Sequence, residues 1–119
     1  MKITQAFTFE AAHWLPQVPP THRCHNMHGH SYRVEIRLEG PVDPDTGFVV
    51  DFFDVERVFA PLLAQLDHHC LNDIEGLRNP TAENIAVWIW ERVKPVLAPT
   101  AGVVVYETPN CWAEYTGYK

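Results

Sequence analysis

The clearest strand in the sequence is His30-Ser31-Tyr32-Arg33-Val34-Glu35-Ile36-Arg37-Leu38, in which apolar and charged side chains alternate from Tyr32 onward. Successive side chains of a strand point to opposite faces of its sheet, so this stretch predicts one buried face and one charged face. A sheet open to water on one side is typical of antiparallel pairing, because the crossover helices of a parallel sheet cover both of its faces. The stretch therefore predicts an antiparallel sheet with its core on one side.

Other segments complete such a sheet. Strand-like runs occupy residues 3–15, 48–50, 102–106 and 111–115. The first run alternates, so that one face carries Phe7, Phe9, Ala11 and His13. Turn-forming residues fill positions 40–47, and we expect residues 48–50 to be the return arm of a hairpin.

Two segments have the period of amphipathic helices. The apolar side chains of the first recur at Val55, Val58, Phe59, Leu62, Leu63 and Leu66. Asp51 or Asp54 can cap its start, and Pro61 should kink it, at a cost of about 3 kcal/mol in a helix interior. The second helix begins after Thr81, a suitable N-cap, and ends at Pro95.

The order of these elements predicts a single α+β domain over residues 1–119. We expect an antiparallel four-stranded sheet with both helices on one face. A sheet this small has open edges, and pairing those edges between subunits would protect them from aggregation. We therefore expect a ring-like oligomer.

Composition argues against several functions. The chain of 119 residues has a net charge of −6 and no Lys/Arg run, which argues against nucleic-acid binding. No apolar run approaches the roughly 20 residues of a membrane span, and the N-terminus lacks a signal-peptide core. The cysteines, Cys24, Cys70 and Cys111, are odd in number and widely spaced, which suits a reducing, cytoplasmic compartment.

Histidines gather at the start of the clearest strand. Four of the seven lie within residues 22–30, and His28 and His30 flank Gly29. Residues two apart on a strand point the same way, roughly 6.6 Å apart, and His13 lies on the apolar face of the first strand. Three imidazoles suit zinc and leave a fourth coordination position open, as catalytic sites do. The alternative is that these histidines are unrelated and hydrogen-bond at strand ends.

The thiol of Cys24, which precedes His28 by a three-residue gap, has two possible roles. As a fourth ligand it would close the tetrahedron of a structural zinc site, which binds metal without turnover. As a free thiol among histidines and Arg23, it would favour the reactive thiolate form. The sequence leaves both roles open.

Two acidic residues, one at the end of a predicted helix and one at the end of a predicted strand, are further candidates for the functional site. Asp67 can orient His68 for proton transfer, although a histidine there also suits the helix dipole, and His69 could serve equally. Glu107 follows the apolar run 103–106. It is either the exposed end of a strand or a carboxylate that accepts a flat pair of N–H groups.

Short motifs occur in a fixed order along the chain. They are Phe9-Glu10-Ala11-Ala12-His13, Cys24-x3-His28-Gly29-His30, Asp51-Phe52, Leu66-Asp67-His68-His69, Leu71-Asn72-Asp73, Asn79-Pro80-Thr81-x-Glu83 and Glu107-Thr108. In combination they resemble the 6-pyruvoyl-tetrahydropterin synthase superfamily over essentially the whole chain. The gap between Cys24 and His28 is most similar to that of its bacterial members, the 6-carboxy-5,6,7,8-tetrahydropterin synthases of queuosine biosynthesis.

The resemblance implies a tunnelling fold, in which subunits join their sheets into a barrel and barrels stack, often as a homohexamer built as a dimer of trimers. It implies Zn²⁺ on three histidines, with the active site between subunits. The implied metal ligands are His13, His28 and His30. The implied catalytic residues are Cys24 as a base, with Asp67 and His68 as a second acid/base pair. Glu107 would anchor the pterin ring, helped by Thr81 and Glu83.

The implied activity is that of a carbon–carbon lyase, which converts 7,8-dihydroneopterin triphosphate to 6-carboxy-5,6,7,8-tetrahydropterin, acetaldehyde and triphosphate. A pyruvoyl-type synthase, which eliminates triphosphate without cleaving the carbon side chain, is a second enzyme hypothesis. A non-catalytic zinc module closed by Cys24 is a third hypothesis. His25, which follows Cys24, could compete for zinc or tune the thiol. Arg23 is the local candidate for a cation that binds the triphosphate, and a subunit interface would supply the others.

Overall fold

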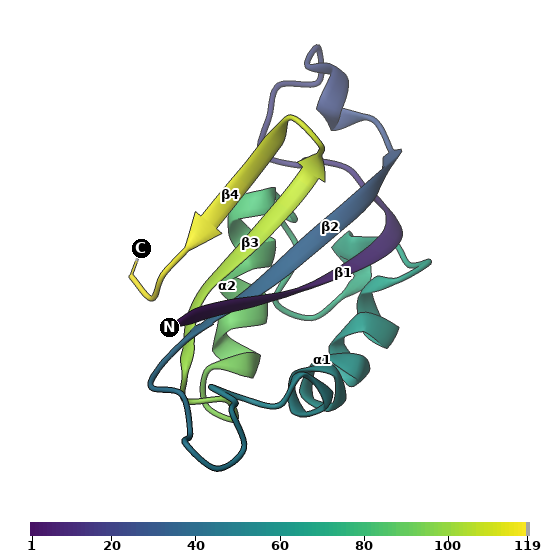
Figure 1. The fold of residues 1–119 in the computed structure, drawn as a ribbon. Helices are drawn as coiled ribbons and strands as arrows, with labels where there is room; N and C mark the ends of the chain where they lie inside the picture. The colour runs from purple at the N-terminus through teal and green to yellow at the C-terminus, as the bar shows by residue number, and fades with distance from the viewer. Residues whose placement is uncertain (119) are drawn as a thin grey trace.

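Strand periodicity produces a four-stranded antiparallel sheet that two helices cover on one face (Figure 1). The computed structural model describes residues 1–118. The sheet order is β1-β2-β3-β4, with strands at Lys2–His13, His28–Glu39, Thr100–Thr108 and Cys111–Tyr115. The helices are α1 (Phe52–Leu66) and α2 (Ala82–Val93), and the single-turn 3-10 helices are η1 (Arg23–His25) and η2 (Leu71–Asp73). The predicted α+β class, strand number and helix placement are confirmed.

The core lies between the helices and the apolar face of the sheet. The strand β2 contributes four side chains that are at most 1% exposed, Tyr32, Val34, Ile36 and Leu38. The buried helical side chains include Val55, Phe59 and Leu66 from α1, and Ile85, Ile89 and Val93 from α2. Each such side chain contributes about 1.5–3 kcal/mol when it leaves water, so this layer holds the sheet and helices together. Within residues 1–118, no helix combines the length and apolar character that crossing a bilayer requires.

Both helices begin at the predicted caps. The Asp51 carboxylate accepts the Phe53 N–H at 2.9 Å, and the Thr81 hydroxyl accepts the Asn84 N–H at 3.1 Å. Pro61 lies inside α1 and does not end it. The helix persists there because buried apolar side chains on its inner face pack against the core, which offsets the backbone hydrogen bond that proline cannot make.

The predicted hairpin arm at residues 48–50 is wrong, because residue 48 has no regular structure and residues 49–50 form a bend. The Asp43 carboxylate accepts the N–H groups of Asp45 and Thr46, at 2.8 and 3.1 Å, and curls the chain into a tight turn. The helix α1 begins directly afterwards at Phe52. The interval between turn and cap is therefore too short for a strand that pairs with the sheet.

The second face of the sheet carries a network of ion pairs. Glu35 is 9% exposed and accepts hydrogen bonds from Arg33 at 3.2 Å and from Arg37 at 3.0 Å. Arg37 also donates to Glu114 of β4 at 2.8 Å. Burial alone would raise the pKa of Glu35, but the hydrogen bonds from Arg37 and Arg33 outweigh it and hold the pKa below its usual value. Glu35 points to the predicted face, but its arginine neighbours cover it from water.

Candidate metal centre and active site

Three imidazoles converge where β1 ends and β2 begins. His13 lies directly opposite His28 in the β1–β2 ladder, and His30 lies opposite Ala11. Opposite residues of an antiparallel pair share a face, as do residues two apart on one strand, so all three rings project together. One nitrogen from each ring lies within 4.8 Å of the others. The structure therefore assembles the triad whose members the strand parity predicted.

The hydrogen bonds of the triad leave its inner nitrogens free. The Nδ1 atoms of His13 and His28 lie 2.8 Å from the Pro80 carbonyl and 2.7 Å from the Asn26 carbonyl. A carbonyl only accepts, so both Nδ1 atoms carry the proton and both Nε2 atoms present lone pairs. These two Nε2 atoms face each other at 3.0 Å, and the buried Nε2 of His30 has no hydrogen-bond partner among residues 1–118. Inward lone pairs and a backbone carbonyl behind the ring are the arrangement that suits a divalent cation.

The protonation states of His13 and His30 also suit a metal. Burial lowers the pKa of His13, and the neighbouring His28 and His30 rings lower it further against the opposing effects of the Pro80 carbonyl and Glu107. Burial likewise lowers the pKa of His30. Neutral imidazole is the form that binds metal, so the folded protein holds these rings ready for an ion.

Cys24 is half-buried in η1 and does not belong to the triad cluster. The set of ligand atoms within 4.8 Å of one another in residues 1–118 contains the three histidines and not its thiol. Three histidines without the cysteine correspond to an open site. This geometry favours a free thiol at Cys24 over a fourth ligand.

Glu107 reaches the triad from the end of β3. Its Oε1 atom lies 3.4 Å from Nε2 of His13 and 3.7 Å from Nε2 of His30. The side chain is 29% exposed, so the carboxylate borders both the histidine triad and solvent. The structure thus brings the predicted anchor residue to the predicted ligands.

Asp67 and His68 form a pair on the outer edge of β1. The Asp67 carboxylate lies 2.9 Å from Nδ1 of His68 and accepts the Glu10 N–H at 2.9 Å. The Glu10 N–H, followed by His68, lowers the pKa of Asp67. His68 has a left-handed φ of +59° and donates its own N–H to the Glu10 carbonyl at 2.6 Å. His69 instead directs its Nδ1 to the Asp67 carbonyl at 2.8 Å, so the carboxylate pairs with His68.

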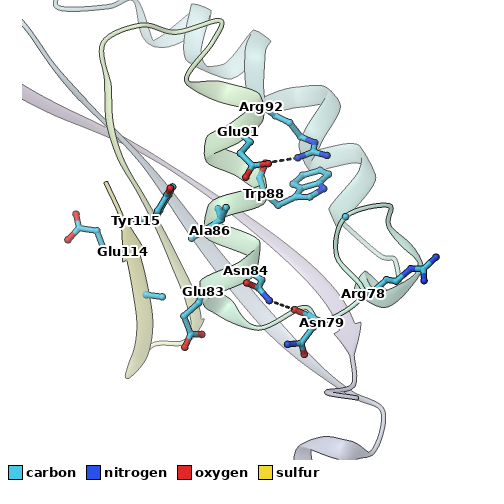
Figure 2. Close-up of a pocket in the computed structure, with 13 residues that line it drawn as sticks. Arg78, Asn79, Glu83, Asn84, Ala86, Trp88, Glu91, Arg92, Glu114 and Tyr115 are labelled. Atoms are coloured by element: carbon cyan, nitrogen blue, oxygen red, sulfur yellow. Dashed lines mark hydrogen bonds between the residues drawn. The ribbon is translucent and has the colours of Figure 1, made fainter. Parts of the chain in front are cut away.

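Thr81 and Glu83 occupy the start of α2. The Thr81 hydroxyl is engaged as the helix cap, and the preceding carbonyl of Pro80 holds His13. A groove of about 760 Å³ lies between α2 and β4. Figure 2 shows Glu83, Trp88 and Tyr115 among the residues that line it. Thr81 is therefore the direct neighbour of Pro80, the residue that contacts the triad. Glu83 lines the groove between α2 and β4 instead.

Three groups that position the triad escaped sequence reasoning. The carbonyls of Asn26 and Pro80 orient His28 and His13, and the buried Tyr32 hydroxyl lies 3.2 Å from Nδ1 of His13. Burial raises the pKa of Tyr32, so its hydroxyl stays protonated. Tyr32 shares the strand parity of His28 and His30, a signal that could have identified it. The carbonyls carry no such signal, because every residue has one.

Comparisons with known proteins agree with this fold. The family model described as 6-pyruvoyl tetrahydropterin synthase matches residues 2–118. A relative from Synechocystis sp., named 6-carboxy-5,6,7,8-tetrahydropterin synthase, is 37% identical, and the match covers 95% of this chain and 91% of the relative. The 6-pyruvoyl tetrahydrobiopterin synthase of Drosophila melanogaster is 34% identical, over 97% of this chain and 79% of the relative.

The same family emerges from the fold alone. The solved structure of Caenorhabditis elegans 6-pyruvoyl tetrahydropterin synthase matches with a TM-score of 0.91 at 28% sequence identity. The match covers 99% of this chain and 96% of that chain. Sequence and structure therefore agree that the chain belongs to the 6-pyruvoyl tetrahydropterin synthase family.

Proposed function

We propose that the protein is a zinc-dependent 6-carboxy-5,6,7,8-tetrahydropterin synthase of queuosine biosynthesis, acting in the cytoplasm on 7,8-dihydroneopterin triphosphate. The observation that carries the proposal is the facing pair of Nε2 atoms of His13 and His28, with the unpartnered Nε2 of His30 beside them. Three neutral imidazoles in this arrangement suit zinc and leave a position for substrate. The relative from Synechocystis sp. bears the same enzyme name at 37% identity.

The reaction is an internal redox step followed by carbon–carbon cleavage. The pterin ring gains the two electrons that the side chain loses, and atom balance requires one water for the products carboxytetrahydropterin, acetaldehyde and triphosphate. No external oxidant is needed. A zinc ion held by His13, His28 and His30 would act as a Lewis acid on the side-chain hydroxyls of the substrate.

Proton transfer falls to two groups of the protein. The Cys24 thiolate removes a proton from the substrate side chain, and His68, paired with the Asp67 carboxylate at 2.9 Å, exchanges a second proton. The left-handed backbone of His68 supports this role, because strain of this kind is concentrated at functional sites. Glu107 orients the pterin ring by accepting two of its N–H groups, helped by Thr81, which is the neighbour of the Pro80 carbonyl that lies against His13.

The active site is completed between subunits. The strands β1 and β4 are the two edges of the sheet in one chain, and pairing β4 of one copy with β1 of the next closes a barrel. Residues 67–70 already cover the edge of β1 near its C-terminal end. The N–H of Ala12 donates to the His69 carbonyl at 3.1 Å, and Ala12 forms an isolated parallel β-bridge with Cys70. The earlier part of β1 is therefore the edge offered to a partner. Size-exclusion chromatography with light scattering distinguishes the expected hexamer from a monomer.

The decisive experiment follows the products of the zinc-loaded protein. Incubation with 7,8-dihydroneopterin triphosphate is expected to release acetaldehyde and triphosphate in equal amounts, with 6-carboxy-5,6,7,8-tetrahydropterin in the chromatogram. Chelation of the metal should stop the reaction, and added zinc should restore it. Triphosphate release without acetaldehyde would instead identify a pyruvoyl-type synthase, the activity named for the Drosophila relative.

Cys24→Ala separates an enzyme from a non-catalytic zinc module. If the thiol is a base, zinc content persists at one ion per chain while turnover collapses. If the thiol is a ligand, zinc content and thermal stability fall together. His69→Ala is a suitable control, because this exposed ring contacts the Asp67 carbonyl and not its carboxylate.

A further inference from the structure

Two members of the histidine cluster, His22 and His25, have no part in the triad. We infer that His22 is a positioning residue for Cys24, because its imidazole caps the single turn of helix that carries the thiol. The inference rests on the proposed role of Cys24 as the proton-transferring thiol.

The backbone of Cys24 is held at both of its polar groups. Its N–H donates to Nδ1 of His22 at 3.0 Å, and its carbonyl accepts the N–H of Leu15 at 2.8 Å. The backbone of His22 is itself anchored, because its N–H donates to the Pro19 carbonyl at 2.8 Å and its carbonyl accepts the His25 N–H at 3.0 Å. The ring and backbone of His22 therefore fix the turn in which Cys24 is the central residue.

This cap matters because little packing holds η1, whose one aromatic contact within residues 1–118 is that of the His25 ring with Trp14 at 6.0 Å between ring centroids. No residue of Arg23–His25 is buried, and a 3-10 turn of this length has few hydrogen bonds of its own. Helix caps are ordinarily Ser, Thr, Asp or Asn, so an imidazole in this position is unusual. The backbone N–H of Cys24 can only donate, so the Nδ1 atom of His22 is the acceptor of this hydrogen bond.

The same short segment also leads into the metal centre. The next residue after η1 is Asn26, whose carbonyl accepts Nδ1–H of His28 at 2.7 Å. The turn capped by His22 thus lies between Leu15, which follows β1, and the first residue of β2. Fixing this turn sets where the thiol stands relative to the metal-binding rings, and small misplacements of a catalytic group are costly.

A pair of isosteric variants tests the cap. His22→Asn places an amide oxygen where Nδ1 lies and keeps an acceptor, whereas His22→Leu has the shape of asparagine without one. Thr46→Ala is the matched control, because the Thr46 hydroxyl caps the Phe48 N–H two residues on, at 3.2 Å, beyond the opposite end of β2. Each zinc-loaded variant is compared by hydrogen exchange in residues 22–27, by zinc content, and by kcat and KM.

Loss of an ordinary cap shifts a local equilibrium about fivefold, so exchange in residues 22–27 should accelerate by about that factor in His22→Leu. The kcat of this variant should fall by about fivefold or more, with KM and zinc content unchanged, because the thiol is misplaced while substrate and metal still bind. His22→Asn and Thr46→Ala should resemble the parent protein. Equal exchange and equal kcat in His22→Leu and His22→Asn would overturn the inference.

The cap and the proposed function fail in distinguishable ways. If Cys24→Ala retains turnover while His22→Leu still accelerates exchange, the role of the thiol is wrong and the inference that the cap positions a catalytic group falls with it. If Cys24→Ala abolishes turnover but His22→Leu keeps the parent kcat, the thiol is catalytic and His22 does not position it.

Discussion

Asn72→Ala tests whether one amide side chain holds the end of β1, and with it His13, in place. Asn72 Oδ1 accepts the Trp14 N–H at 3.0 Å, and its Nδ2 donates to the Trp14 carbonyl at 2.8 Å. The side chain thereby ties η2 to both backbone groups of the residue that follows His13. At about 1 kcal/mol net for each hydrogen bond, the variant should lose about 2 kcal/mol of unfolding free energy. The thermal midpoint should then fall by roughly 8 °C for a domain of this size.

Urea unfolding of the metal-free protein at fixed protein concentration measures this loss. Asn84→Ala is the control, because its Nδ2 makes an exposed hydrogen bond to the Asn79 carbonyl at 2.8 Å and its loss should cost less than about 0.5 kcal/mol. A competing chelator should also report weaker zinc binding in Asn72→Ala than in the control, because the residue that follows His13 loses its anchor to η2 and the His13 ring is less firmly positioned. Equal urea midpoints for the two variants would refute the reasoning.

Three further predictions concern protons, substrate and backbone. Because burial lowers the pKa of His13 and His30 in the folded state, the unfolded chain binds more protons just below pH 6.5, and the metal-free protein should lose stability as the pH falls below that value; urea midpoints that stay constant with pH would contradict this. Glu107→Gln should raise KM about tenfold or more while zinc content is unchanged, since a charge-assisted hydrogen bond to the pterin is lost; an unchanged KM would remove Glu107 from the substrate site. Gly76→Ala should destabilise the fold by more than about 1 kcal/mol in urea unfolding, because the residue has φ +88° and the new Cβ would lie 3.2 Å from a tryptophan carbon of α2. Gly47→Ala, with φ +79° and open space around it, should cost less, and the reverse order would count against the steric argument.

Local rules account for most of the fold. Alternation in β2 and helical spacing in α1 and α2 depend only on near neighbours in the chain, and the caps Asp51 and Thr81 lie where their chemistry places them. The wrong prediction of a strand at residues 48–50 also arises from relying on local pattern alone. Strand pairing there would need room between the Asp43 turn and the Asp51 cap, which periodicity does not measure.

The family resemblance is confirmed. Some features of the candidate site could be predicted from local sequence patterns, and others could not. Parity placed His28 and His30 on the covered face of β2, and their convergence with His13 follows from that placement together with the register of β1. The individual roles of Cys24 and Glu107 stay predictions; the carboxylate of Glu107 lies within 3.7 Å of two triad nitrogens, and the thiol of Cys24 lies outside the triad.

What the sequence determined by itself is which side chains share a face, because the periods of strands and helices are properties of the backbone alone. Tertiary structure alone decided which faces meet and what lies behind them. It set the Pro80 carbonyl against His13 and brought Glu107 from the end of β3 to the same ring. Such contacts join residues far apart in the chain, and they depend on packing distances of a few ångströms that no local pattern encodes.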